Sequence, residues 1–362
     1  MRATVCALAA AISLFAHPAF AQSDRAAAAF WRKVRTTCDA TAAKPPGELG
    51  KRIAQSAIVE FNNFGGHQID SNGRLFHFGL TEAEHEEDDG GARQATVGHL
   101  GWWQVLKYWR SLYGDRTGDY LEAVGYRDAS AATQEAEAAA LVRTSATRLL
   151  SLADSVTDPE EREILREAAW RAAIVDTAWS AAFISYVVRQ PDVDASKFRF
   201  ANAHRAYIYD AFATSAAEVA DEKNDRIYRA CPINTRPRPG DMICHQRESA
   251  LADVSDEAVR EQIRTELATN SEKRSVRRTH CDVVAHVDTR ARKVYTIGGN
   301  VNQAVTVRKQ NLRRGLRFAA SQKGHCGGKN QWTLPQSDGQ PPRAMQKCSL
   351  NDRKWFVLLQ VR

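Results

Sequence analysis

Residues 177–191, TAWSAAFISYVVRQP, decide the fold, because they predict a buried helix with a small polar residue, Ser180, near its start. Apolar residues recur here at intervals of three and four, which is typical of a helix with one face in a core. These residues are Phe183, Ile184, Val187 and Val188. Ser180 precedes the first two by three and four residues and therefore shares their inward face. Pro191 ends the helix.

Ser180 is a candidate nucleophile. We expect Asp176 or Thr177 to cap the helix, which places Ser180 in the first turn, where free N–H groups favour developing negative charge. This position would lower the pKa of a thiol into the working range. A serine hydroxyl is a much weaker acid and needs a positioned general base. The alternative is structural, because a small residue here allows a helix to pack closely on a sheet.

The segment 279–288, THCDVVAHVD, offers such a base, because it predicts a strand that opens with His280. Asn300 ends the sequence GGN (298–300), which predicts a tight turn after the next strand, and its side-chain oxygen is suited to orient the imidazole. Asp282 shares the strand face of His280 and is the second candidate for that role. Spacing alone favours the structural alternative, in which His280 lies at a strand edge and bonds to backbone.

The chain changes character near its middle. The first half predicts helices, including one that starts at an Asp–Pro pair, 158–159. The second half holds short segments rich in Val and Ile, which predict strands. A helical first half followed by a central helix and an antiparallel sheet indicates an α+β protein. The other predicted helices cover 24–43, 47–66, 97–114, 129–153, 158–175 and 202–222, and the predicted strands cover 240–246, 280–288, 293–299, 303–309 and 354–362.

We therefore expect three regions. Residues 1–21 are a signal peptide, 22–157 form a helical N-terminal region packed on the core, and 158–362 form the α+β core with a helical insertion near 249–278. The polar segment 69–91 predicts a loop. Its acidic run is suited to bind a cation, but a solvated loop is the favoured interpretation.

The first residues are typical of an exported protein. Arg2 precedes an apolar run and a small-residue cleavage site after Ala21. A membrane anchor is the alternative, but the run is short for a bilayer span. Cys6 lies too early for a lipoprotein cysteine. We expect a periplasmic or secreted protein with no stable membrane anchor after cleavage.

The cysteines predict disulfides. Of the seven cysteines, Cys6 lies in the signal peptide, and an even count of six remains. Three of the six have a neighbouring histidine, but no Cys-x-x-Cys spacing supports zinc, so we expect no metal and no cofactor. A free thiol acting as a relocated nucleophile is the less favoured alternative.

Charge is not diagnostic of a partner. The formal net charge is +7, spread along the chain, which suits an anionic cell envelope and equally an ordinary solvated surface. The densest basic run, KRSVRRTH (273–280), predicts an exposed loop rather than a nucleic-acid site. We expect a monomer that binds no nucleic acid.

Several motifs together resemble one bacterial family, domain of unknown function 2272. They are EFNNFGG, GLTEAE, YWRSL, AWSAAFISYVVRQ, FRFANAHRAYI, PRPGDMICHQR, HCDVVAHVDTRARKVYTIGGNVNQAVTVR and the terminal KWFVLLQVR. They follow the family order over roughly residues 55–362. On this resemblance the chain is identified as a member of that family.

The family is in turn similar to the NlpC and CHAP cysteine peptidases and amidases of bacterial cell walls. Those enzymes carry WCAAF where this chain has WSAAF, and a GHVG strand start where this chain has THCD. The resemblance implies a papain-like fold acting on peptidoglycan, with Ser180 as nucleophile, His280 as base and Asn300 as third residue. The chain departs from the pattern of these enzymes in two ways. It has serine in place of the nucleophilic cysteine, and residues 168–179 contain no Gln or Asn that could supplement the oxyanion hole.

The same resemblance implies other roles. Trp179 N–H, His67 or Glu82 would substitute for the missing oxyanion donor, and Trp179, His204 and Asp282 are candidates to line the cleft. His204 is equally a capping or packing residue. The implied disulfides are Cys244–Cys281, Cys326–Cys348 and Cys38–Cys231.

Two main hypotheses follow. The chain is a hydrolase of peptidoglycan peptide or amide bonds, or it is a catalytically inactive papain-like module that binds a cell-wall fragment or a protein partner. An exported effector or its neutraliser also fits the signal peptide, without support from particular residues.

Overall fold

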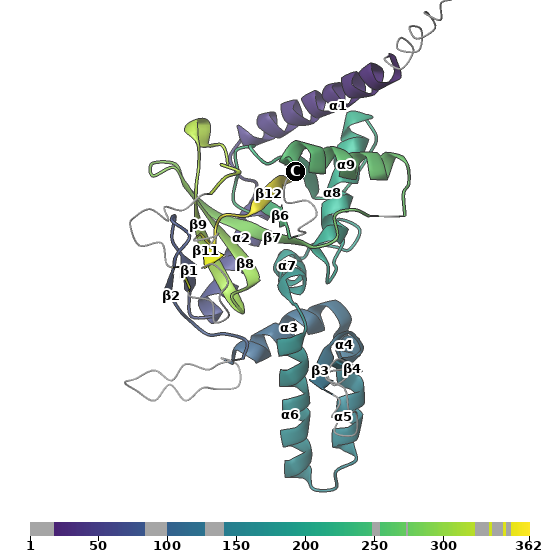
Figure 1. Ribbon diagram of the computed structural model, residues 1–362, viewed down its shortest axis with the longest axis vertical. Coiled ribbons are helices and arrows are strands. Elements are labelled where there is room, and N and C mark those ends of the chain that lie inside the picture. Colours follow the sequence, from purple (N-terminus) through teal and green to yellow (C-terminus); the bar gives the residue numbers. More distant parts are fainter. Residues whose placement is uncertain are drawn as a thin grey trace, which may run out of the picture.

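A computed structural model describes residues 18–83, 100–126, 141–247, 254–272, 274–322, 333–334, 343–344 and 349–362. The protein is mixed α+β, with one large, mostly antiparallel sheet and helices around it (Figure 1). The predicted α+β class is therefore confirmed. In the described part of the chain, no helix has the length and apolar character needed to cross a membrane.

Within the described residues, eight strands form the large sheet in the order β2-β1-β9-β8-β7-β6-β12-β5. All neighbours pair antiparallel except β1 and β9, which are parallel. The strands are β1 (His67–Ile69), β2 (Leu75–His77), β5 (Tyr228–Pro232), β6 (Met242–Gln246), β7 (Thr279–Asp288), β8 (Lys293–Val301), β9 (Ala304–Asn311) and β12 (Lys354–Val361). The five predicted strands are all present. β2 lies inside the segment predicted as a polar loop, 69–91, and β1 ends at its first residue.

The helices are α1 (Pro18–Ala42), α2 (Glu48–Asn63), α3 (Gly101–Tyr113), α4 (Thr117–Tyr120), α5 (Ala146–Asp154), α6 (Pro159–Asp176), α7 (Ser180–Arg189), α8 (His204–Val219) and α9 (Asp256–Ala268). Shorter elements are η2 (Gly114–Arg116), η4 (Arg314–Leu316) and two small hairpins, β3 (Glu122–Tyr126) with β4 (Leu141–Ser145) and β10 (Thr333–Leu334) with β11 (Arg343–Ala344). Helices α3 to α6 extend away from the large sheet as an arm (Figure 1).

Helix α6 begins at the Asp–Pro pair 158–159, as predicted. The Asp158 side chain accepts hydrogen bonds from the backbone N–H groups of Glu160 and Glu161, both at 2.9 Å, and Pro159 is the first helical residue. The helix predicted over 129–153 is only partly correct. Residues 141–145, LVRTS, form β4 and pair with β3, because the β-branched Val142 and Thr144 favour a strand. Residues 127–140 lie outside the described part of the chain.

The tight turn predicted at residues 298–300 is wrong. These residues belong to β8, and the turn to β9 is made by Asn302 and Gln303, whose φ angles are 53° and 62°. A two-residue loop with both φ angles positive is the hairpin turn that matches strand twist. Asn300 itself has φ 53° and lies where the β8–β9 register shifts, between Gly298 and Val301.

The two glycines of β8 are explained by packing. A Cβ on Gly299 would lie 2.5 Å from side-chain atoms of Phe183, so α7 rests directly on β8 here. A Cβ on Gly298 would lie 2.0 Å from Asp282 Oδ1 on the neighbouring strand. The pair of glycines therefore lets the helix and a buried carboxylate approach the same strand, which positions the candidate site.

Candidate functional site

Ser180 is the first residue of α7 and is 6% exposed. The predicted capping by Asp176 or Thr177 is wrong: the N-cap is Trp179, and its side chain makes no capping hydrogen bond. Asp176 instead ends α6 and accepts a hydrogen bond from Val124 N at 2.7 Å. Ser180 nonetheless keeps its predicted place at the helix N-terminus, where the backbone N–H groups favour negative charge.

The hydroxyl of Ser180 contacts a histidine. Its Oγ lies 2.7 Å from Nε2 of His204, the first residue of α8, and Nδ1 of His204 contacts the Tyr207 hydroxyl. Burial lowers the pKa of His204 well below its ordinary value, and the nearby His280 and Arg247 lower it further. The His204 ring is therefore neutral near pH 7, with one nitrogen donating and the other accepting.

His280 is engaged at both ring nitrogens. Arg247 Nη2 lies 2.9 Å from His280 Nδ1, and His280 Nε2 lies 2.8 Å from Asp282 Oδ1. A guanidinium only donates, so Nδ1 accepts and the ring proton is on Nε2, which donates to Asp282. Burial lowers the pKa of His280 well below its ordinary value, and Arg247, Arg308 and Arg353 add to that effect.

The two histidines join these pairs into one group. The ring centroids of His204 and His280 are 5.0 Å apart, so Ser180, His204, His280 and Asp282 form a continuous buried row from α7 through α8 to β7. The structure thus brings together four of the candidate residues. In this row Asp282 is the residue that bonds His280, and within the described residues no hydrogen bond joins His280 to Asn300.

Asp282 is held by charge and hydrogen bonds. Arg308 Nε lies 3.2 Å from its Oδ2, and Thr296 donates to the same oxygen at 3.4 Å. Asp282 and His280 are both 0% exposed, so the carboxylate lies in the interior between His280 and Arg308. Spacing along β7 predicts the contact between Asp282 and His280, whereas Arg308 comes from another strand and was not predicted.

Trp179 and Glu82 lie next to the row. The Trp179 side chain is 0% exposed, stacks on Phe64 and donates its indole N–H to Glu82. Burial raises the pKa of Glu82 to about 7, although the bond from Trp179 opposes this shift. His67 contacts the carbonyl of Gly79 at 3.1 Å. The oxyanion roles of Trp179, His67 and Glu82 stay predictions.

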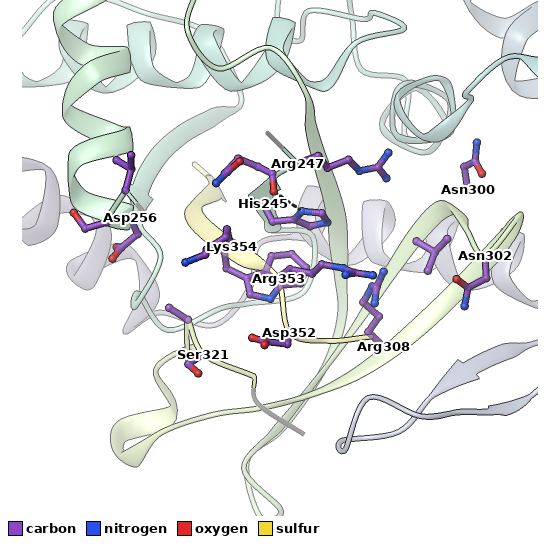
Figure 2. A pocket seen from close by; sticks show the side chains of 16 residues that line it. His245, Arg247, Asp256, Asn300, Asn302, Arg308, Ser321, Asp352, Arg353 and Lys354 are labelled. Atoms are coloured by element: carbon purple, nitrogen blue, oxygen red, sulfur yellow. Dashed lines mark hydrogen bonds between the residues drawn. The ribbon is translucent and has the colours of Figure 1, made fainter. Parts of the chain in front are cut away.

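A cavity of about 900 Å³ lies beside the row (Figure 2). Asn300 is on its wall, together with His245, Arg247 and Arg308, while Ser180 and His204 are not among the described residues that line it. His245 pairs with His280 across β6 and β7, and their ring centroids are 5.3 Å apart. In the sequence His245 stands out only as a neighbour of Cys244, because its place beside His280 depends on the register between β6 and β7.

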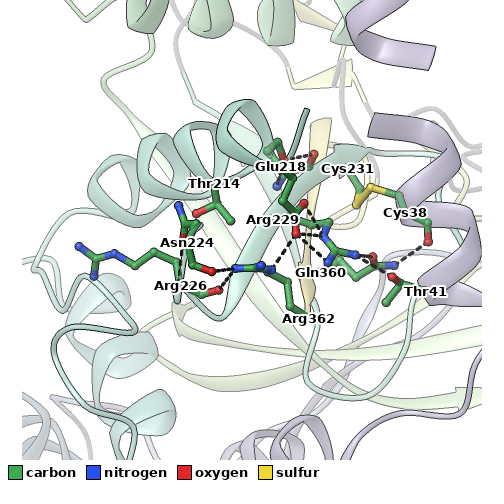
Figure 3. Close-up of polar contacts among 12 residues, drawn as sticks. Cys38, Thr41, Thr214, Glu218, Asn224, Arg226, Arg229, Cys231, Gln360 and Arg362 are labelled. Carbon is green, nitrogen blue, oxygen red and sulfur yellow. Dashed lines mark hydrogen bonds and ion pairs between the residues drawn. A yellow bond between two sulfur atoms is a disulfide. The ribbon is translucent and has the colours of Figure 1, made fainter. Parts of the chain in front are cut away.

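The structure forms two of the implied disulfides. Cys244–Cys281 joins β6 to β7 directly after His280. Cys38–Cys231 ties α1 to β5, and Gln360 donates to the Cys38 carbonyl at 3.0 Å beside it (Figure 3). The implied pair Cys326–Cys348 lies outside the described residues. Over the described ranges, no group of three or more His, Cys, Asp or Glu side chains is arranged to hold a metal ion.

Comparison with known proteins gives one match. No curated protein and no solved structure matches the chain. A family model described as an uncharacterized protein conserved in bacteria (DUF2272) matches residues 98–361, which is most of the 362 residues. This span contains Ser180, His204, His280 and Asp282. The chain therefore belongs to the DUF2272 family.

Proposed function

We propose that the protein is a papain-like hydrolase that cleaves a peptide or amide bond of peptidoglycan in the periplasm, with Ser180 as nucleophile. The observation that carries the proposal is the 2.7 Å contact between Ser180 Oγ, at the N-terminus of α7, and Nε2 of a neutral histidine, His204. Nucleophile and base within hydrogen-bond reach are the signature of an activated serine.

In the proposed reaction, His204 Nε2 takes the proton of Ser180 as Oγ attacks the substrate carbonyl carbon. The free N–H groups in the first turn of α7 stabilise the oxygen that becomes negative. His204 then gives its proton to the leaving amine, and water hydrolyses the acyl-serine by the same route in reverse. Asp282 opposes the lowering of the His204 pKa, so its charge supports the imidazolium that forms.

This scheme assigns the base role to His204 rather than to His280, which the resemblance implies. Both His280 nitrogens are bonded, to Arg247 and to Asp282, and neither bond is to Ser180. His280 is better suited to hold Asp282 in place near His204, because it bonds Asp282 and its ring centroid is 5.0 Å from that of His204. A helix packed on an antiparallel sheet, with these side chains between them, supports the proposed papain-like arrangement.

A second candidate is a non-catalytic module that binds a cell-wall fragment. It is favoured by the contact between the Tyr207 hydroxyl and His204 Nδ1. When Tyr207 donates this hydrogen bond, the His204 proton is on Nε2 and points at Ser180, so His204 cannot accept the serine proton. Catalysis needs the opposite arrangement, with Nδ1–H donating to Tyr207.

The test is product release from peptidoglycan sacculi by purified protein, followed by chromatography of soluble fragments. We expect wild type to release fragments, and Ser180→Ala to lose activity by about a thousandfold or more. Ser151→Ala, an exposed serine on α5, is the matched control and should retain activity. No product from wild type, but product from Ser180→Cys, would contradict the hydrolase and support the non-catalytic module.

A further inference from the structure

Three arginines surround one end of the cavity beside the histidines. Arg247 directly follows β6, Arg308 lies in β9 and Arg353 directly precedes β12, and all three line the pocket together with His245 (Figure 2). We call this cavity the arginine pocket. Lys354 also lines it. Four cationic side chains lining one pocket give it a strong local positive charge.

The described acidic groups neutralise this charge only in part. Asp282 lies behind the wall and pairs with Arg308 at 3.2 Å. Asp256 and Asp352 line the pocket. Asp256 pairs with Arg260, at 2.5 Å, and among the described residues no ion pair joins Asp352 to Arg247, Arg308 or Arg353. No carboxylate of the described residues forms an ion pair with Arg353 or Lys354.

The positive groups are held close despite their mutual repulsion. Arg308 is 3% exposed and is fixed by donating to the Leu350 carbonyl at 2.6 Å. Burial lowers the pKa of Arg247, and Arg353 lowers it further, against the opposing effect of Asp282. Burial likewise lowers the pKa of Arg308, with Arg353 and Arg247 contributing. An anion in the pocket would offset this repulsion.

We propose that the arginine pocket binds the anionic group, a carboxylate or a phosphate, of a ligand. The planar guanidinium fork matches the paired oxygens of either group. The cavity of about 900 Å³ is far larger than a single ion and lies within the range of small-molecule sites. Its uncharged polar wall, including Asn300, Asn302 and Ser321, suits hydrogen bonding to the rest of that ligand.

The pocket is linked to the buried row. Arg247 lines the pocket and also donates to His280, which lies beside His204. A ligand anchored at Arg247 is therefore separated by His280 from His204, the histidine that contacts Ser180. Identifying this ligand with the substrate rests on the proposed function, and deepens it by requiring an acidic group on the substrate. The binding itself does not require Ser180 to react.

The test is calorimetric titration of the Ser180→Ala variant, so that turnover plays no part. The probes are inorganic phosphate, N-acetyl-alanyl-alanine and the C-terminal amide of the same dipeptide. We expect at least one anionic probe to bind with a Kd below about 10 mM, and Arg353→Gln to weaken it about tenfold, the effect of losing one charge-assisted hydrogen bond. Arg290→Gln, an exposed arginine outside the pocket, is the matched control and should bind as before.

The three probes distinguish the two kinds of anion. Tighter binding of N-acetyl-alanyl-alanine than of its amide identifies a carboxylate ligand, and binding of inorganic phosphate alone identifies a phosphate ligand. The inference is overturned if neither anion binds, or if Arg353→Gln and Lys354→Gln leave binding unchanged. Binding without any hydrolysis by the wild type contradicts the proposed function and leaves the pocket assignment intact.

Discussion

Ser180 Oγ lies 2.7 Å from Nε2 of His204, so the candidate nucleophile on α7 meets a histidine of α8 and not the strand histidine His280. The two ring nitrogens of His280 are bonded instead to Arg247 and Asp282, at 2.9 and 2.8 Å. The contact with Ser180 makes His204 the residue whose replacement best tests how the row works.

Replacing His204 separates two arrangements of the site. Under the proposed function, His204→Gln lowers kcat/KM by about a thousandfold or more, because the only base in contact with Ser180 within the described residues is lost. Asn300→Ala lowers kcat/KM by less than about tenfold, since the described residues show no bond from Asn300 to His280. The measurement is hydrolysis of soluble peptidoglycan fragments. A larger loss in Asn300→Ala than in His204→Gln would instead favour His280 as base with Asn300 orienting it.

Asp282→Asn should destabilise the fold strongly. The variant leaves the buried Arg308 guanidinium without its carboxylate, and removal of one partner of a buried pair costs about 3–5 kcal/mol. The free energy of unfolding in urea measures this loss. Asp225→Asn, on an exposed residue, is the control and should stay within about 0.5 kcal/mol of wild type. A loss below 1 kcal/mol for Asp282→Asn would show that the pair contributes little.

Glu82 makes stability depend on pH. Its pKa rises from 4.5 to about 7 in the folded protein, because burial penalises the charged form. The contribution of protonated Glu82 to the free energy of unfolding is fully present below pH 4.5 and is lost as the pH rises through 7. Glu82→Gln should therefore gain stability relative to wild type between pH 5 and pH 8, by about 1–3 kcal/mol.

The matching measurement is urea unfolding of both proteins at several pH values. The free energy of unfolding of Glu82→Gln should still fall as the pH rises, because burial also raises the pKa of Asp241 to about 7. Parallel stability curves for wild type and Glu82→Gln would contradict the assignment.

Gly299→Ala should loosen the contact between α7 and β8. The added Cβ would lie 2.5 Å from the Phe183 side chain, and overpacking of this kind costs about 1–3 kcal/mol. Gly125→Ala provides the comparison, because a Cβ there meets nothing within 4 Å. Thermal unfolding of the two variants should show a clear drop for the first and little change for the second. A drop of equal size in both would rule out the packing explanation.

The Cys38–Cys231 disulfide should stabilise the attachment of α1. It closes a loop with a sequence separation of 193 residues, and loss of a native disulfide typically costs about 2–5 kcal/mol. The double variant Cys38→Ala/Cys231→Ala should unfold at lower urea and expose α1 to protease earlier than wild type. Wild-type protease resistance of α1 in this variant would mean that the hydrogen bonds around Gln360 suffice (Figure 3).

Much of the fold was predictable because its signals are local. The apolar stripe of α7, the Asp–Pro start of α6 and the Val- and Ile-rich strands each follow from the spacing of a few neighbouring residues. Predictions failed where tertiary contacts override such signals. The β4 segment directly follows an Ala-rich sequence typical of a helix but pairs with β3. Gly298 and Gly299, predicted as a turn, lie in β8, where they allow close packing, and the turn lies at 302–303.

The site was predictable only as a set of residues. Sequence by itself determined that Ser180 starts a buried helix, that His280 and Asp282 share one strand face, and that the chain has the motifs of its family. Only the tertiary structure decided which histidine meets Ser180. That choice depends on how α8 packs beside α7, and on Arg247, which bonds a nitrogen of His280. Long-range packing sets the hydrogen-bond partners of buried groups, so residue spacing within one segment cannot predict them.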